Sequence, residues 1–208
     1  VQFMTCTDEE ISRQIALAAH YDRDHVKRVF LADGDALVLS TEKLLKILRV
    51  LFETFPKLQR VSSYAAPQDI LRKSVEELKQ LQEAGLKLLY YGMESGDDVV
   101  LKAVKKGVSG PEAIEAGKRV VEAGIKLSLM VILGLAGADG SDRHARETAR
   151  AINEIEPNML SALTLMLYRG SELLDQYERG EFAPLTPQGI MLELHKIISL
   201  VELPPEDH

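Results

Sequence analysis

The sequence predicts an α/β fold in which parallel strands alternate with outer helices. Five short apolar runs are each followed by a helical pattern, and their starts lie about 28–39 residues apart, which leaves room for a strand, a crossover helix and two loops. The same helix-to-strand junction, Glu-Ala-Gly followed by Leu or Ile and then Lys, occurs twice. Five strands cannot close an eight-stranded barrel, which usually takes about 250 residues. The two folds that remain possible are therefore an open partial barrel and a doubly wound sheet.

Each predicted strand has the length and the β-branched or aromatic content of a buried strand. The five are Val26–Ala32, Leu58–Tyr64, Leu86–Met93, Ile125–Leu133 and Leu160–Leu167.

The predicted helices carry recognisable start and stop signals. Three of them open with a capping box, formed by the pairs Thr7 and Glu10, Ser74 and Glu77, and Ser109 and Glu112. Gly85 and Gly124 stand where a left-handed residue would end a helix. Helices are also expected at 41–55, 141–155 and 186–201.

The composition indicates one soluble domain over residues 1–208, with 202–208 as a flexible tail. A net charge of −7 does not favour a surface that holds nucleic-acid phosphates. The chain has neither a run of ~20 apolar residues nor a signal-peptide pattern. A single cysteine, Cys6, suits a reducing compartment, so we expect a cytoplasmic protein with no membrane partner. The oligomeric state is left open.

Polar residues at the predicted strand ends are the candidate site, because both remaining folds place their chemistry there. Asp33-Gly34-Asp35 follows the first strand and would bind a metal or ligand, cap a helix, or form a plain turn. Glu94 follows a nearly all-apolar run and would meet a ligand's hydroxyls or ammonium group. The alternative is a solvated Glu94 beside a helix cap at Ser95–Asp97.

The fourth and fifth strands offer weaker candidates. Alternation places Ser128, Met130 and Ile132 on one face, where the first two would either border a ligand or fill the core. Arg169 would hold an anion or lie on the surface, and His144 is expected to cap a helix or lie on the surface.

The order of these segments is more specific than any one of them. A strand ending in a Gly-acid pair is followed by YYGMESGDDVVLKAVKKG, then AGIKLSLMVILGLAG, then LTLMLYRGSEL. This series resembles the radical S-adenosylmethionine (SAM) superfamily core, particularly the branch of oxygen-independent coproporphyrinogen oxidases and Elongator-type catalytic subunits. The resemblance runs from about Thr7 to Leu174. It implies a partial open parallel (β/α)6-type barrel, with strands two to six present here.

The resemblance also implies a function. Members bind a 4Fe-4S cluster through Cys-x3-Cys-x2-Cys after their first strand, and SAM chelates its unique iron. Reductive cleavage of SAM then gives a 5′-deoxyadenosyl radical that abstracts a substrate hydrogen. A small-molecule substrate is favoured over nucleic acid, and a flavodoxin or ferredoxin would supply electrons.

The resemblance assigns SAM contacts to residues of three strands and their ends, and to one lysine between two helices. Gly34 and Asp35 would lie near the methionyl amine, with Asp35 replacing the usual glutamate. Glu94, followed by Ser95, would contact the ribose hydroxyls, and Lys106 would lie near the SAM carboxylate. The remaining assignments concern the ribose and adenine surfaces, which would be bordered by Ser128, Met130, Gly134 and Leu135.

The chain departs from the family at its cysteines. It contains no Cys-x3-Cys-x2-Cys, and Cys6 lies downstream of the expected loop. Either the first strand and the cluster loop precede Val1, or the chain is a cluster-free scaffold relative. The first is favoured, because losing the strand would leave an unpaired parallel edge. An enzymatic rival would use Asp33, Asp35 and Glu94 to hold Mg²⁺.

Overall fold

A computed structural model describes residues 7–202, except for the side chain of Asp33. Cys6 and residues 203–208 of the predicted tail 202–208 lie outside the described residues. The five strands are β1 (Arg28–Asp35), β2 (Arg60–Ala65), β3 (Leu86–Glu94), β4 (Lys126–Leu133) and β5 (Met159–Thr164). The helices are α1 (Asp8–Asp22), the short η1 (Ala36–Val38), α2 (Thr41–Thr54), α3 (Pro67–Leu71), α4 (Val75–Glu83), α5 (Asp98–Ala103), α6 (Gly110–Glu122), α7 (Gly137–Ile155), α8 (Glu172–Glu178) and α9 (Pro187–Leu200).

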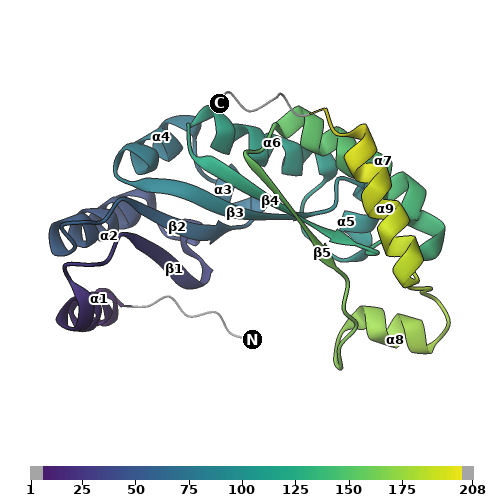
Figure 1. Cartoon of the computed structure of the whole chain (residues 1–208), viewed down its shortest axis with the longest axis horizontal. Coiled ribbons are helices and arrows are strands. Elements are labelled where there is room, and N and C mark those ends of the chain that lie inside the picture. Colours follow the sequence, from purple (N-terminus) through teal and green to yellow (C-terminus); the bar gives the residue numbers. More distant parts are fainter. Residues whose placement is uncertain (1–6, 203–208) are drawn as a thin grey trace.

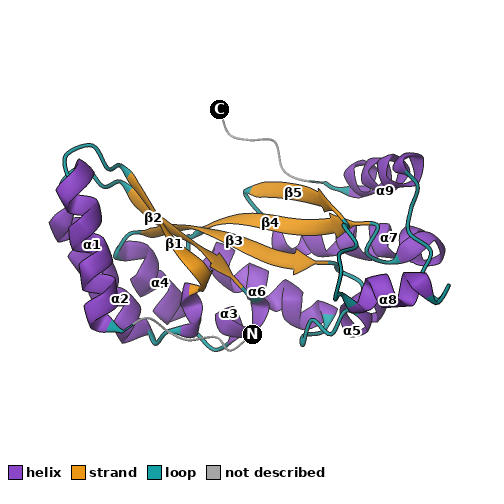
Figure 2. Cartoon of the chain, turned by 90° about the horizontal axis from the view of Figure 1, so that it is seen from below, coloured by secondary structure: helices purple, strands orange, loops and turns teal. Residues whose placement is uncertain are grey.

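The strands form one parallel sheet in the order β1-β2-β3-β4-β5, so every neighbour in the sheet is also the next strand in the chain. The sheet is curved and not closed (Figure 1). Helices α3, α4, α6 and α7 pack along one face, and no described helix lies over the other (Figure 2). This arrangement confirms the predicted partial open barrel, and it leaves the concave face free for a ligand.

The two faces of β4 show which side is the core. Leu127, Leu129 and Val131 are fully buried under the helices, where removal from water drives folding. Met130, on the opposite face, is only half-buried. Ser128 shares that open face but is 3% exposed. Alternation along this strand therefore separates the core from the candidate site, as predicted.

The predicted helix signals are present in the structure. All three capping boxes form, with reciprocal side-chain and backbone bonds at each N-terminus. Gly85 and Gly124 have φ values of +112° and +74°, which are accessible mainly to glycine. The two Glu-Ala-Gly segments therefore end α4 and α6 in a similar way, directly before β3 and β4.

The first and last strands differ from the prediction. Strand β1 continues through Asp33-Gly34-Asp35, so this segment is irregular strand instead of a turn. Its pairing with β2 skips from Leu31 to Asp35, and Gly34 at φ +121° permits the irregularity. Strand β5 ends at Thr164, three residues before the predicted end at Leu167. The Leu165 N–H still bonds the Leu133 carbonyl at 3.0 Å, but the chain then leaves the sheet.

Helix α7 begins at Gly137 and not at Ser141, because the glycine-rich segment after β4 forms its first turn. His144 consequently lies well inside the helix and is 0% exposed. The expectation that it caps a helix or lies on the surface was wrong. No helix within residues 7–202 is long and apolar enough to cross a membrane.

Candidate functional site

The carboxyl end of β3 has an unusual backbone. The pairing with β4 shifts between Gly92 and Glu94, and Glu94 has a φ of +66°, a left-handed conformation that is disfavoured for residues with a side chain. Met93 is completely buried. A Cβ atom on Gly92 would lie 2.7 Å from Glu94 Oε1. The glycine thus leaves space for the glutamate to fold back over its own strand.

Lys106, in the segment between α5 and α6, binds this carboxylate. Its Nζ donates a hydrogen bond of 3.0 Å to Glu94 Oε1. The two side chains are partly shielded, with 20% and 23% of their surfaces exposed. A carboxylate has about four acceptor positions, so Glu94 can still accept from a ligand's hydroxyls while Lys106 attracts an anionic group. Of the alternative interpretation, the helix cap is confirmed, because Asp97 caps α5. Its other half, a solvated Glu94, is not what the structure shows.

Two further predicted residues lie beside this pair. Met130 is the direct partner of Gly92 in the β3–β4 register, and Ser128 is the partner of Tyr90. Neighbouring strands lie about 4.8 Å apart, so Met130 borders the site. The structure therefore brings together Glu94, Lys106 and Met130, with Ser128 one step further from the strand end.

Asp35 lies on the far side of β2, linked to β3 through Tyr64 and Tyr90. Its carboxylate accepts hydrogen bonds from the backbone N–H groups of Leu37 at 2.8 Å and Ala66 at 2.5 Å. Burial raises the pKa of Asp35 to about 6, and the neighbouring Asp69 adds to the rise. This carboxyl group is therefore poised to change charge close to neutral pH. Gly34 beside it is exposed.

Three predicted residues lie elsewhere. Ser95 is 0% exposed, and its Oγ is 2.9 Å from His144 Nδ1 in the helix layer. The Gly134 N–H donates to the carboxylate of Glu193 on α9 at 2.7 Å. Leu135 is buried, at 6% exposed. The Gly134 carbonyl also accepts the Gly137 N–H at 3.1 Å. These polar groups are thus used inside the protein, and only the backbone of Leu135 remains for a ligand.

Other sequence candidates are not part of this group. Arg169 is exposed in the segment after β5. Among the side chains that the structure describes, no three His, Cys, Asp or Glu residues converge as a metal site. The ammonium group of Lys106 beside Glu94 would repel Mg²⁺. The Mg²⁺ alternative thus gains no support from the geometry.

Sequence reasoning missed Gly92 and Glu193. A glycine inside an apolar strand is a signal for close approach of another group, and Gly92 carried it. Glu193 gave no such signal, because a single glutamate on an amphipathic helix is normally solvated. Only the fold reveals that this one is 2% exposed.

Comparison with known proteins shows the family of the chain. The model of the Radical SAM superfamily matches residues 5–150. The heme chaperone HemW of Bacillus subtilis is 22% identical over 198 residues, covering 95% of this chain and 51% of that protein. The tRNA uridine(34) acetyltransferase of Methanocaldococcus infernus is 26% identical over 112 residues, covering 53% of this chain and 21% of that protein. The chain therefore spans about half the length of the first relative and less of the second.

Solved structures share the fold. The coproporphyrinogen III oxidase HemN of Escherichia coli, described as a radical SAM enzyme, superposes with a TM-score of 0.70 at 16% identity, covering 91% of this chain and 43% of that one. The archaeal Elp3 of Methanocaldococcus infernus superposes with a TM-score of 0.64 at 18% identity, covering 91% of this chain and 47% of that one.

Proposed function

Since the chain belongs to the radical SAM superfamily, we propose that it forms the SAM-holding part of a radical SAM enzyme. The observation that carries the proposal is the Glu94–Lys106 pair. It lies at the carboxyl end of a central strand, beside a half-buried Met130 and on the face of the sheet that no described helix covers. Ligands of barrels and open α/β sheets bind at such strand ends.

The residues present fit the polar groups of SAM. Glu94 would accept hydrogen bonds from the ribose hydroxyls, and Lys106 would attract the methionyl carboxylate. Asp35, when ionised, would attract the methionyl ammonium group. Met130 would cover the apolar side of the nucleoside, and Gly92 keeps open the space that the Glu94–Lys106 pair occupies.

SAM, reductively cleaved at a 4Fe-4S cluster, would supply a 5′-deoxyadenosyl radical for hydrogen abstraction. The 208 residues contain one cysteine, so they cannot provide three thiolate ligands. We propose that a preceding strand and cysteine loop provide them. A groove of about 560 Å³ between α1, β1 and α2 supports this proposal, because it lies along the edge strand β1. Its lining is mainly apolar, including Ile11, Ile15, Val29, Leu31, Leu51 and Phe55.

For the substrate we propose a small molecule, with electrons from a flavodoxin or ferredoxin. The acidic net charge of −7 supports this over a nucleic acid. Three aromatic rings also cluster on β1, β2 and β3, with Phe30 and Tyr64 edge to face at 4.9 Å and Tyr90 within 6.1 Å of both. Phe30 and Tyr64 are 38% and 49% exposed, which suits contact with an apolar surface.

Calorimetric titration of the full-length protein with SAM, and separately with Mg²⁺, tests the proposal. We expect saturable SAM binding that Glu94→Gln weakens, and no tight Mg²⁺ site. Tight Mg²⁺ binding without SAM binding would favour the carboxylate-metal enzyme. The absence of both, with no iron or sulfide after anaerobic reconstitution, would favour a cluster-free scaffold.

A further inference from the structure

We infer that His144 is a positioning residue that couples the backbone after β3 to the backbone after β4. The inference rests on the proposed function, since only then do these two segments hold opposite sides of SAM. Its basis is a chain of buried polar contacts that begins next to Glu94 and ends next to Leu135. Helices α7 and α9 contribute side chains to it, and the SAM contacts proposed above use none of its side chains.

The first half of the chain fastens the loop between β3 and α5 to helix α7. Ser95 Oγ contacts His144 Nδ1 at 2.9 Å and accepts the Asp97 N–H at 2.9 Å. The Gly96 N–H donates to Thr148 Oγ1 at 3.1 Å. The side chains of Ser95, Asp97, His144 and Thr148 are all buried. Consecutive residues of the loop that follows Glu94 are therefore anchored to helix α7.

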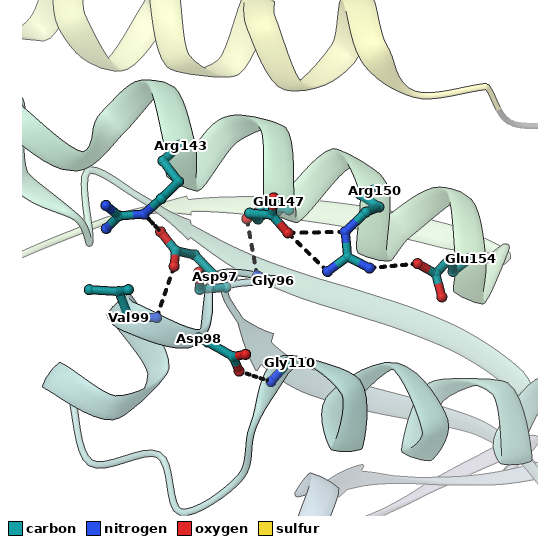
Figure 3. Close-up of polar contacts among 11 residues, drawn as sticks. Gly96, Asp97, Asp98, Val99, Gly110, Arg143, Glu147, Arg150 and Glu154 are labelled. Carbon is teal, nitrogen blue, oxygen red and sulfur yellow. Dashed lines mark hydrogen bonds and ion pairs between the residues drawn. The ribbon is translucent and has the colours of Figure 1, made fainter.

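The same loop is also held by charge. Arg143 Nε lies 2.7 Å from the buried Asp97 carboxylate, which in turn caps the Val99 N–H at 2.8 Å (Figure 3). A Cβ atom on Gly96 would lie 2.3 Å from the Glu147 carbonyl oxygen, so loop and helix are in close contact. Such anchoring suits a loop whose first residue, Glu94, has a strained φ of +66°, because a strained residue persists only when its surroundings fix it.

The second half of the chain fastens the β4–α7 turn to helix α9. Glu193 is 2% exposed, and its Oε1 accepts the Gly134 N–H at 2.7 Å. Its Oε2 accepts a hydrogen bond from the Ser141 hydroxyl group. A buried carboxylate requires such donors. The turn that leads into Leu135 is thus positioned from α9, more than fifty residues later in the sequence.

His144 joins the two halves. Its Nε2 lies 3.7 Å from Glu193 Oε1, beyond hydrogen-bond range but close enough for electrostatic attraction. Burial lowers the pKa of His144, and the positive charge of Arg143 lowers it further. The negative charges of Glu193 and Asp97, together with the Ile132 carbonyl, oppose this lowering. Burial thus favours the neutral form of the ring. Nε2 lies nearest the Glu193 carboxylate and has no hydrogen-bond partner among the described residues. This favours the tautomer with the proton on Nε2, in which the Ser95 hydroxyl group donates to Nδ1.

Hydrogen exchange of the full-length protein tests the coupling without any ligand. We expect Ser95→Ala, the mildest change, to speed amide exchange about ten-fold in the distant segment 133–138. Glu193→Ala should speed exchange to a similar degree in segment 94–97. Glu154→Ala, at an exposed ion pair of the same α7, is the matched control and should alter neither segment. Changes confined to each mutated residue's own surroundings would overturn the inference.

SAM titration of the same variants separates this inference from the proposed function. Ser95→Ala and His144→Asn should raise the Kd for SAM about ten-fold, while Glu154→Ala leaves it unchanged. A Kd within two-fold of the wild-type value in folded Ser95→Ala and His144→Asn would overturn the positioning role and leave the proposed function standing. A wild-type protein that binds no SAM, yet shows the reciprocal exchange effects, would overturn the proposed function and support the coupling.

Discussion

Glu94 and Lys106 form a 3.0 Å ion pair across the carboxyl end of β3, although twelve positions separate them in the sequence. Glu94 reaches this pair from a left-handed backbone conformation at φ +66°, which costs roughly 1–2 kcal/mol for a residue with a Cβ. A partly exposed ion pair contributes about 0–1 kcal/mol, so it does not offset that cost on its own. We therefore propose that ligand binding, more than stability, explains the arrangement.

Glu94→Gln should separate binding from stability. We expect the SAM Kd to rise about ten-fold or more, because a hydrogen bond to a charged group contributes about 1.5–3 kcal/mol. The melting temperature should change by only a few degrees.

Lys106→Met should weaken binding of SAM more than binding of 5′-deoxyadenosine, which lacks the methionyl carboxylate. Calorimetry with both ligands measures this, and equal losses would remove Lys106 from the carboxylate site.

Gly92→Ala should disturb the site without unfolding the protein. The new methyl group would lie 2.7 Å from Glu94 Oε1, so the carboxylate must move aside. We expect SAM affinity to fall about as far as in Glu94→Gln, and the double variant to show less than the sum of the two effects, because the residues are in contact. Additive losses in a double-mutant cycle would contradict the proposed steric relationship.

The paired glycines after α4 and α6 provide a test of the fold. A Cβ on Gly85 would lie 2.1 Å from a ring carbon of Phe52, whereas the nearest atom to a Cβ on Gly124 is a flexible Gln82 amide at 3.8 Å. Gly124→Ala should lower the free energy of unfolding by about 1–2 kcal/mol through its positive φ alone. Gly85→Ala should lose about 1–3 kcal/mol more through overpacking. Denaturant titration compares the two, and equal losses would contradict the difference in packing.

Asp35 should make SAM binding depend on pH. Burial raises its pKa from an ordinary value of 3.8 to about 6. If the ionised carboxylate attracts the methionyl ammonium group, affinity should rise as pH increases through about 6, and Asp35→Asn should remove that rise. The stability of the protein should change with pH in the opposite direction, because the folded state holds the Asp35 proton more tightly than the unfolded state. The contribution of protonated Asp35 to the free energy of unfolding is complete below about pH 4 and is lost as pH rises through about 6. An NMR titration midpoint for Asp35 near 4 would contradict both the predicted pH dependence of SAM affinity and that of stability.

The parallel fold followed from local patterns that the structure retains. Capping boxes and the two Glu-Ala-Gly junctions depend on residues close in sequence, so their effect on the backbone is predictable. The end of β1 was less predictable. Asp-Gly-Asp suggested a turn, but pairing with β2 extended the strand through Gly34 to Asp35.

The site was only partly predictable, because side-chain contacts depend on how distant elements pack. Glu94 stood out as a carboxylate after an apolar run, yet its bond to Lys106 required the fold. Ser95 and Gly134 were expected to face a ligand, and the structure directs the Ser95 hydroxyl to His144 and the Gly134 N–H to Glu193. The role of Glu193 depends on α9 lying against α7, which no local pattern indicated.

Formation of 5′-deoxyadenosine by the anaerobically reconstituted full-length protein tests the central proposal most directly. With SAM and dithionite, the protein should bind iron and sulfide and release 5′-deoxyadenosine and methionine, and Glu94→Gln should lower the yield at subsaturating SAM. A protein that assembles the cluster, yet neither binds nor cleaves SAM, would contradict the assignment of this strand-end site to SAM.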